Sequence, residues 1–138
     1  MYKTDYGPEA FTADIIKAVL NNNNFRTALW TGRYLQLTLM NIPARENIGL
    51  EVHPDTDQFL FIAEGCAAVQ MGEQKENLTK QEPVFCDNAI FIPAGIWHNI
   101  INTGNRPLKL FSIYAPPKHA PGTVHRSKEI AEAKEHSH

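Results

Sequence analysis

The chain has 138 residues, 43% of them hydrophobic, and a formal net charge of −2 at pH 7. This size and hydrophobic content predict one domain with a substantial core, while the scattered basic residues argue against nucleic acid or an anionic membrane as a partner. No apolar run approaches the roughly 20 residues of a membrane span. The N-terminal residues lack the apolar core of a signal peptide. The two cysteines fit a reducing cytoplasm, where we expect the protein.

The first predicted element is a short N-terminal helix over residues 7–22. Apolar side chains recur there at helical spacing, at Phe11, Ile15, Ala18 and Val19. Pro8 stands near the start of this helix, and the asparagine run at 21–24 ends it, because asparagine favours turns over helix interiors. The apolar stripe is expected to pack on the rest of the domain.

Residues 25–115 are predicted to form a β-barrel, because the hydrophobic period changes there from that of a helix to that of strands. Short apolar or alternating segments are separated by turn sequences such as HPDTD, PAG and NTGNRP, with no helical segment between them. Strands at such short spacing indicate an all-β sandwich or barrel. We find no internal repeat and no second domain, so residues 1–138 are treated as a single domain.

The alternation is clear at residues 33–42, which place two sets of side chains on opposite faces. One set is Leu35, Leu37 and Leu39, and the other is Tyr34, Gln36, Thr38 and Met40. The second set is expected to line the inside of the barrel, where Gln36 could contact a substrate.

Residues 116–138 are predicted to form a proline-rich arm and then a helix from about Ser127, since serine is a favourable N-cap. His119 and His125 lie in this arm. We interpret them as exposed surface histidines, with the alternative that the arm folds over the mouth of the barrel or clasps a second subunit.

Polar side chains flank the predicted turn at residues 54–57. Glu51 and His53 are two residues apart, so on a strand they face the same side. Gln58 begins the returning strand, about one strand spacing of ~5 Å away. The residues after Gln58 are almost wholly apolar, and a carboxylate in such surroundings needs a cation or hydrogen bonds. Histidine and carboxylate are ligands of first-row metals, so the segment is either a solvated hairpin end or part of a metal site.

A second segment, FIPAGIWHNIIN at residues 91–102, favours the metal site. It resembles the second motif of the cupin family, which is written as Gly, five residues, Pro-x-Gly, two residues, His, three residues, Asn. The matching residues are Pro93, Gly95, His98 and Asn102. In the first cupin motif, His53 falls on the second histidine and Gly65 on the closing glycine. The resemblance covers about residues 33–115.

The chain departs from the cupin motifs in its leading glycines and in two ligand positions. Arg45 and Asp87 replace the glycines, Glu51 stands where the family has its first histidine, and Gln58 stands where it has glutamate. The resemblance therefore implies a metal set of Glu51, His53, Gln58 and His98. The charge of this set is unchanged, because the acid has moved from the last motif-one position to the first. Gln58 could itself bind the ion or could orient Glu51 by a hydrogen bond.

The resemblance to cupins implies a fold, a cofactor and three alternative functions. The fold is a double-stranded β-helix, the jelly-roll-like cupin barrel, and we expect a homodimer. The cofactor is a divalent ion (zinc, iron, manganese or nickel), and the partner is a small-molecule substrate or ligand. The first function is that of the mannose-6-phosphate isomerase-like cupins, a metal-dependent enzyme on a small polar metabolite, with Glu51 as its catalytic base. The alternatives are a non-haem iron(II) dioxygenase and a non-catalytic cupin that binds a small ligand.

Overall fold

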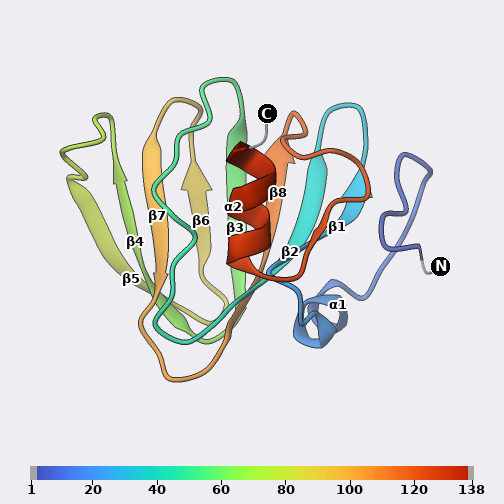
Figure 1. Ribbon diagram of the computed structural model, residues 1–138, viewed down its shortest axis with the longest axis horizontal. Helices are drawn as coiled ribbons and strands as arrows, with labels where there is room; N and C mark the ends of the chain where they lie inside the picture. Colours follow the sequence, from blue (N-terminus) through green and yellow to red (C-terminus); the bar gives the residue numbers. More distant parts are fainter. Residues whose placement is uncertain (1–2, 137–138) are drawn as a thin grey trace.

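The computed structural model describes residues 3–136, which form nine strands and two helices (Figure 1). The strands are β1 (Arg26–Thr31), β2 (Gln36–Ile42), β3 (Asp57–Glu64), β4 (Cys66–Gly72), β5 (Lys80–Phe85), β6 (Ala89–Ile92), β7 (Trp97–Asn102), β8 (Leu108–Ala115) and β9 (Val124–His125). The helices are α1 (Ile15–Asn21) and α2 (Lys128–His136). Neither helix has the length and apolar character needed to cross a membrane.

The strands form two sheets whose inner faces enclose the core. One sheet has the order β6-β3-β8-β2-β1-β9 and the other β5-β4-β7, and the paired strands are antiparallel. Leu60 and Leu110 from the first sheet and Val69 and Ile100 from the second are almost completely buried in one cluster. The predicted all-β double-stranded β-helix is therefore confirmed. In Figure 1, α2 lies across the front of the barrel beside the long connection from β2 to β3.

The alternation of β3 assigns its side chains to the two faces of the larger sheet. Gln58 and Leu60 are buried inside the barrel, whereas Phe59 and Phe61 lie on the outer face. There the rings of Phe59 and Phe61 contact the ring of Phe111, at centroid distances of 6.0 and 5.4 Å. The inward face of β3 thus brings one polar side chain, Gln58, into an otherwise apolar row.

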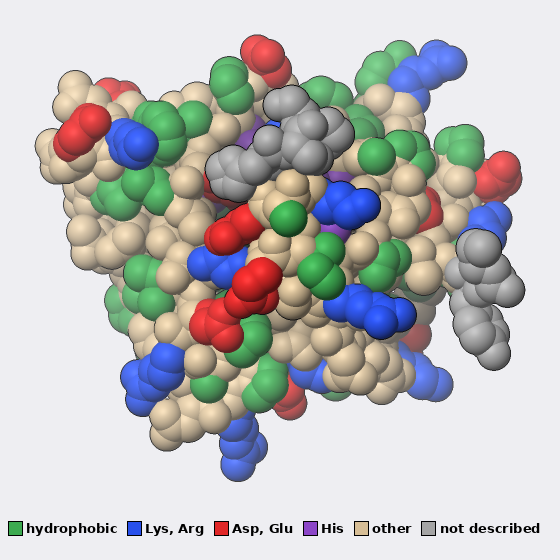
Figure 2. Space-filling model, in the orientation of Figure 1, with side chains coloured by type: hydrophobic (Ala, Val, Ile, Leu, Met, Phe, Trp, Pro, Cys, Tyr) green, Lys and Arg blue, Asp and Glu red, His purple; other side chains and the backbone are tan. Residues whose placement is uncertain are grey.

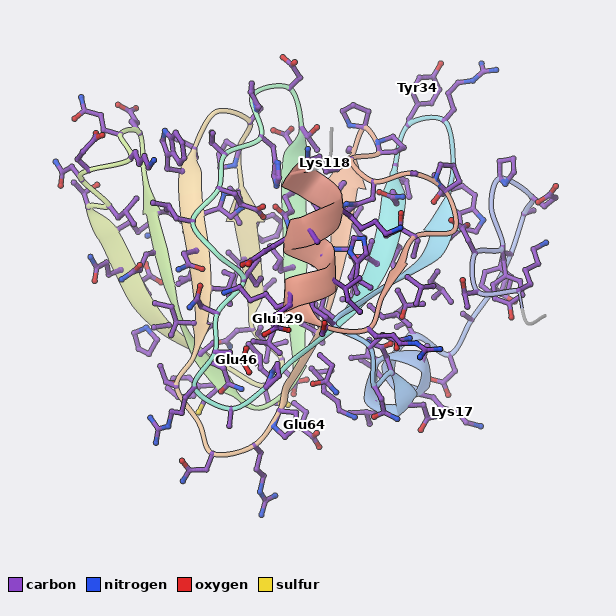
Figure 3. All side chains as sticks on the ribbon, viewed as in Figure 1. Lys17, Tyr34, Glu46, Glu64, Lys118 and Glu129 are labelled. Carbon is purple, nitrogen blue, oxygen red and sulfur yellow. The ribbon has the colours of Figure 1, made fainter. Side chains whose placement is uncertain are left out.

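Two of the side chains that β2 directs into the barrel are polar. The strand itself begins at Gln36, later than the predicted residue 33. Gln36 and Thr38 are fully buried, and Met40 is nearly so, as expected for residues that line the barrel. The prediction for Tyr34 is wrong, because this side chain is 74% exposed and points away from the barrel (Figure 3). Gly32 donates a backbone hydrogen bond to the carbonyl of Leu35, so residues 32–35 are the turn between β1 and β2 rather than strand.

The N-terminal helix is shorter than the predicted range of 7–22, since α1 begins only at Ile15. Asp14 is its N-cap and accepts a hydrogen bond from the amide of Lys17, at 3.2 Å. The residues before Asp14 are tied to β1 instead of forming helical turns. The amide of Tyr6 donates to the carbonyl of Leu29, and the indole of Trp30 donates to a backbone carbonyl of this segment.

The C-terminal segment folds back onto the barrel. Ser127 caps α2 as predicted, because its hydroxyl accepts a hydrogen bond from the amide of Ile130. Before this helix, β9 pairs with β1 and becomes an edge of the larger sheet. His125 in β9 is consequently buried, at 7% exposure, so its interpretation as an exposed surface residue is wrong. His119 is half-buried.

Candidate metal centre

Glu51 is held in place by pairing with β7. The amide of Glu51 donates to the carbonyl of His98 at 3.0 Å, and the amide of His98 donates back to Glu51 at 2.9 Å. The predicted hairpin, in which this segment would pair with the start of β3, is replaced by this contact with a strand more than forty residues later in the chain. His53 is fixed by a hydrogen bond from the amide of Gly95, in the turn that precedes β7, to its carbonyl.

Three side chains converge as a result. Oε1 of Glu51 lies 3.3 Å from Nε2 of His53 and 3.5 Å from Nε2 of His98. One possible ligand atom from each residue falls within 4.8 Å of the others. Both imidazoles are buried, and the Glu51 side chain is 26% exposed, so the carboxylate is the most accessible member of the cluster.

A ring nitrogen of each histidine faces the carboxylate. Nδ1 of His98 lies 3.0 Å from the carbonyl oxygen of Ile96, which only accepts hydrogen bonds, so Nδ1 carries the proton and Nε2 of a neutral ring offers a lone pair. Nε2 of His53 and Nε2 of His98 are both buried and have no hydrogen-bond partner among the described residues. A carboxylate beside these nitrogens is compensated either by a proton on the ring or by a cation between the two atoms.

The charge state of Glu51 agrees with this arrangement. Burial raises the pKa of the Glu51 carboxyl, but hydrogen bonds and Coulombic attraction from the His53 and His98 rings in their protonated form lower it by more, so the net pKa lies well below the usual range. A carboxylate and two imidazoles are hard and borderline donors that first-row divalent ions accept. The donor set therefore fits such an ion.

Gln58 is held by the sheet rather than by Glu51. Its Nε2 donates to Oγ of Ser112 on the adjacent strand β8, at 2.9 Å, and its Oε1 is buried without a hydrogen-bond partner among the described residues. The amide is therefore oriented by Ser112, and its carbonyl oxygen is left for another partner. Ser112 and Tyr114 share the inward face of β8, and plain strand alternation in the sequence could have identified both.

The two residues that replace the motif glycines adopt a backbone conformation that glycine favours. Arg45 has φ of +67° and Asp87 has φ of +71°, which is the left-handed region that favours glycine. Asn102, the last residue of the second motif, is buried and donates to three backbone carbonyls. The chain therefore keeps the left-handed backbone conformation at both positions without a glycine.

Tyr114 on β8 and His119 in the arm lie next to the cluster. The ring of Tyr114 lies 5.8 Å from that of His53 and 5.2 Å from that of His119, measured between centroids. Gln36 fastens the arm: its Nε2 donates to Thr31 and to the carbonyl of His119, and its Oε1 accepts from the amides of Lys118 and His119. These bonds use the full hydrogen-bonding capacity of the amide, so Gln36 is a structural clamp and the predicted substrate contact is wrong.

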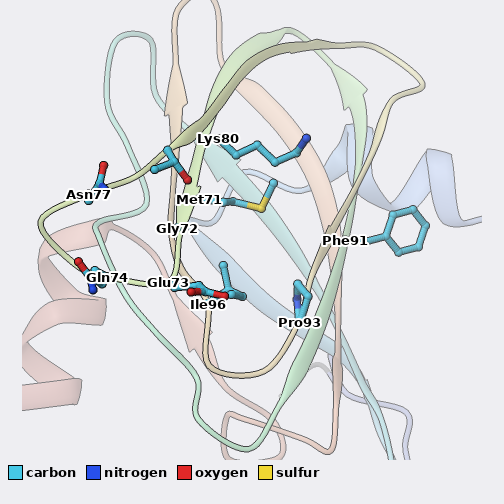
Figure 4. A pocket seen from close by; sticks show the side chains of 10 residues that line it. Met71, Gly72, Glu73, Gln74, Asn77, Lys80, Phe91, Pro93 and Ile96 are labelled. Atoms are coloured by element: carbon cyan, nitrogen blue, oxygen red, sulfur yellow. The ribbon is translucent and has the colours of Figure 1, made fainter.

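A separate pocket of about 510 Å³ lies between the β4–β5 hairpin and the turn before β7 (Figure 4). Met71, Pro93 and Ile96 supply its apolar wall. Its lining contains neither Glu51 nor a histidine. We therefore place the candidate site at the cluster, not in this pocket.

Comparison with known proteins identifies relatives over nearly the whole chain. A family model described as "Cupin domain" matches residues 38–114. The uncharacterized protein YrkC of Bacillus subtilis (strain 168) is 56% identical over 131 residues, 95% of this chain and 70% of YrkC. The uncharacterized protein L612 of Acanthamoeba polyphaga mimivirus is 36% identical over 117 residues, 84% of this chain and 71% of L612. The crystal structure of BH2720 from Bacillus halodurans superposes with a TM-score of 0.94 at 59% identity, covering 94% of this chain and 98% of that one.

Proposed function

Because the chain belongs to the cupin family, we propose that it is a metal-dependent enzyme acting on a small polar metabolite, with Glu51, His53 and His98 holding one divalent first-row ion. One observation carries this proposal: two buried imidazole nitrogens face the same carboxylate oxygen at 3.3 and 3.5 Å and lack hydrogen-bond partners among the described residues. Zinc, iron, manganese and nickel all accept this donor set.

The chain's own residues prepare the site for a substrate oxygen. A bound divalent ion would supply Lewis acidity toward a carbonyl or hydroxyl oxygen of the substrate. The carbonyl of Ile96 fixes the tautomer and orientation of His98, as partners of ligating histidines do in metal sites. Ser112 similarly orients Gln58, whose free carbonyl oxygen offers a fourth donor to the ion or an acceptor to the substrate.

Glu51 is the group we propose as proton acceptor. It is charged at neutral pH, because its pKa is held low by the two imidazoles after burial has raised it, and it is the most exposed member of the cluster. A carboxylate so placed serves the proton transfer of an isomerisation of the sugar or sugar-phosphate type. The substitution Glu51→Gln keeps the shape of the side chain and removes both its charge and its basicity.

A non-haem iron(II) dioxygenase is the second candidate, and the ligand types favour it. Two histidines and one carboxylate are the set found in iron(II) oxygenases with open coordination positions. The two enzyme classes differ in their need for oxygen and iron. Oxygen uptake that requires iron(II) and is absent with zinc supports the dioxygenase, whereas turnover with zinc or manganese under nitrogen supports the isomerase-type enzyme.

Elemental analysis of protein purified without added metal tests the shared basis of both candidates. We expect close to one first-row ion per chain, and a large loss in Glu51→Gln. Lys17→Gln, on the exposed surface of α1, is the control that should keep the ion (Figure 3). A metal-free wild-type protein that also takes up no added ion would leave only the non-catalytic alternative, a cupin that binds a small ligand without a metal.

A further inference from the structure

A basic recess lies where the arm after β8 meets α2. It has a volume of about 510 Å³, and its titratable lining among the described side chains consists of Lys118, His119, His125 and Lys134, none of them a carboxylate. Figure 3 shows Lys118 beside the C-terminal end of α2, and histidine surface is visible on this face of the molecule in Figure 2. Four basic side chains therefore line one hollow of a chain whose net charge is −2.

The walls of the recess are fixed by the barrel. Gln36 holds the backbone of Lys118 and His119 through three hydrogen bonds of 2.9 to 3.2 Å. His125 is held by the pairing of β9 with β1 and by Arg26, whose Nη1 lies 3.0 Å from Nδ1 of His125. Lys118, His119 and His125 therefore project from backbone that is anchored before a ligand arrives.

The positive charge of the recess comes from its cations, and its imidazoles are neutral. A guanidinium only donates hydrogen bonds, so Nδ1 of His125 accepts from Arg26 and that ring carries its proton on Nε2. Burial and the nearby Arg26 charge lower the pKa of His125, and they lower that of His119 to about 3. Nε2 of His119 is buried and has no hydrogen-bond partner among the described residues. The recess thus combines fixed positive charge with neutral imidazole groups.

We propose that this recess binds the anionic group, a carboxylate or a phosphate, of a small molecule. Lys118 and Lys134 supply the charge at its rim, and the His119 and His125 imidazoles offer N–H groups to the oxygens of the anion. The recess is a hollow of small-molecule size with basic groups from one arm and one helix, which suits a compact anion rather than a polyanion that needs an extended basic track.

A series of ring contacts connects the recess to the cluster of Glu51, His53 and His98. Tyr114 lies between His119 and His53, with centroid distances of 5.2 and 5.8 Å, and His119 lies 6.4 Å from His125. If the anion is part of the substrate that reacts at Glu51, His53 and His98, that substrate carries an acidic group. This step rests on the proposed function and deepens it. The anion binding itself does not depend on the metal.

Calorimetric titration of the metal-depleted protein at low ionic strength tests the proposal, with inorganic phosphate and malonate as probes. We expect saturable binding of at least one probe to the wild type. Binding should weaken about tenfold in the double variant Lys118→Gln/Lys134→Gln, because two cations near the anion are lost. The matched double variant Lys17→Gln/Lys75→Gln removes the same charge from exposed lysines outside the recess and should change the affinity less than twofold.

Each result decides the proposal. Phosphate binding alone assigns a phosphomonoester, malonate binding alone assigns a carboxylic acid, and binding of both assigns an anion site that accepts either group. Saturation by neither probe overturns the proposal, and so does an equal loss of affinity in the two double variants. The titration uses metal-free protein, so its outcome does not depend on the metal centre. Anion binding in a protein that binds no metal would refute only the proposed function. Metal binding in a protein that binds no anion would refute only this inference.

Discussion

Replacing Asn102 by alanine should test how the second cupin motif supports the site. The Asn102 side chain is 1% exposed, and its Nδ2 donates to the carbonyls of Ile42, Pro43 and Arg106 at 2.9, 3.1 and 2.9 Å. Its Oδ1 accepts a hydrogen bond from the amide of Gly104 at 2.9 Å. The amide thus fastens the start of the long β2–β3 connection, which carries Glu51 and His53, to the end of β7.

The expected cost follows from these bonds. Each hydrogen bond contributes about 1 kcal/mol net, and a buried group left without its partner costs more. Asn102→Ala leaves backbone carbonyls and one N–H without the side-chain partner, so the free energy of unfolding should fall by about 3 kcal/mol. For a domain of this size, that loss corresponds to a decrease in Tm of about 10 °C.

Urea denaturation followed by circular dichroism measures this change. The control is Asn105→Ala, which removes the same atoms from an exposed asparagine whose Oδ1 accepts one hydrogen bond from Arg45. The control should lose less than about 0.5 kcal/mol, as surface substitutions usually do. A loss below 1 kcal/mol for Asn102→Ala, or equal losses in both variants, would refute the reasoning.

Two further predictions concern the arm. Gln36→Ala removes three hydrogen bonds to residues 118 and 119, so hydrogen–deuterium exchange should become faster there, and unchanged exchange would contradict the clamp. The pKa of His119 is lowered from 6.5 to about 3 by burial and by Arg26, so the unfolded chain binds the proton more readily. Stability should therefore fall as the pH drops below about 6.5, and less so in His119→Gln; denaturation midpoints that shift equally between pH 7 and pH 5 would contradict this.

Local patterns in the sequence were sufficient for the barrel. Alternation identifies the inward faces of β2 and β3, including Gln36 and Gln58, because one side of each strand must be buried. Ser127 marks the start of α2 by its chemistry as a cap. A homodimer stays a prediction, since it concerns contacts beyond one chain.

The errors arose where tertiary contacts override a local pattern. Tyr34 continues the alternation of β2, yet a backbone turn at residues 32–35 removes it from the strand. Phe11 continues the helical spacing of the apolar residues in α1, but the segment before Asp14 is fastened to β1. His125 stands in a proline-rich segment without periodicity, and only its pairing with Arg26 in the sheet shows that it is buried.

The candidate site was predicted from its residue types, but its geometry was not. Spacing brings Glu51 and His53 to one side of a strand, and the cupin resemblance adds His98 to them. The pairing of Glu51 with β7 joins residues distant in the chain, and no local pattern reports such a contact. The open Oε1 of Gln58 likewise depends on Ser112, a neighbour on another strand.

Zinc affinity of the metal-depleted protein tests the central claim most directly. A competition titration with a chromophoric chelator should give one zinc ion per chain in the wild type. In His98→Ala the affinity should fall by roughly a hundredfold or more, because a ligand is lost. In His119→Ala, which removes a half-buried imidazole outside the cluster, the affinity should stay within about fivefold of wild type. No zinc bound to the wild type, or full affinity in His98→Ala, would contradict a metal centre at Glu51, His53 and His98.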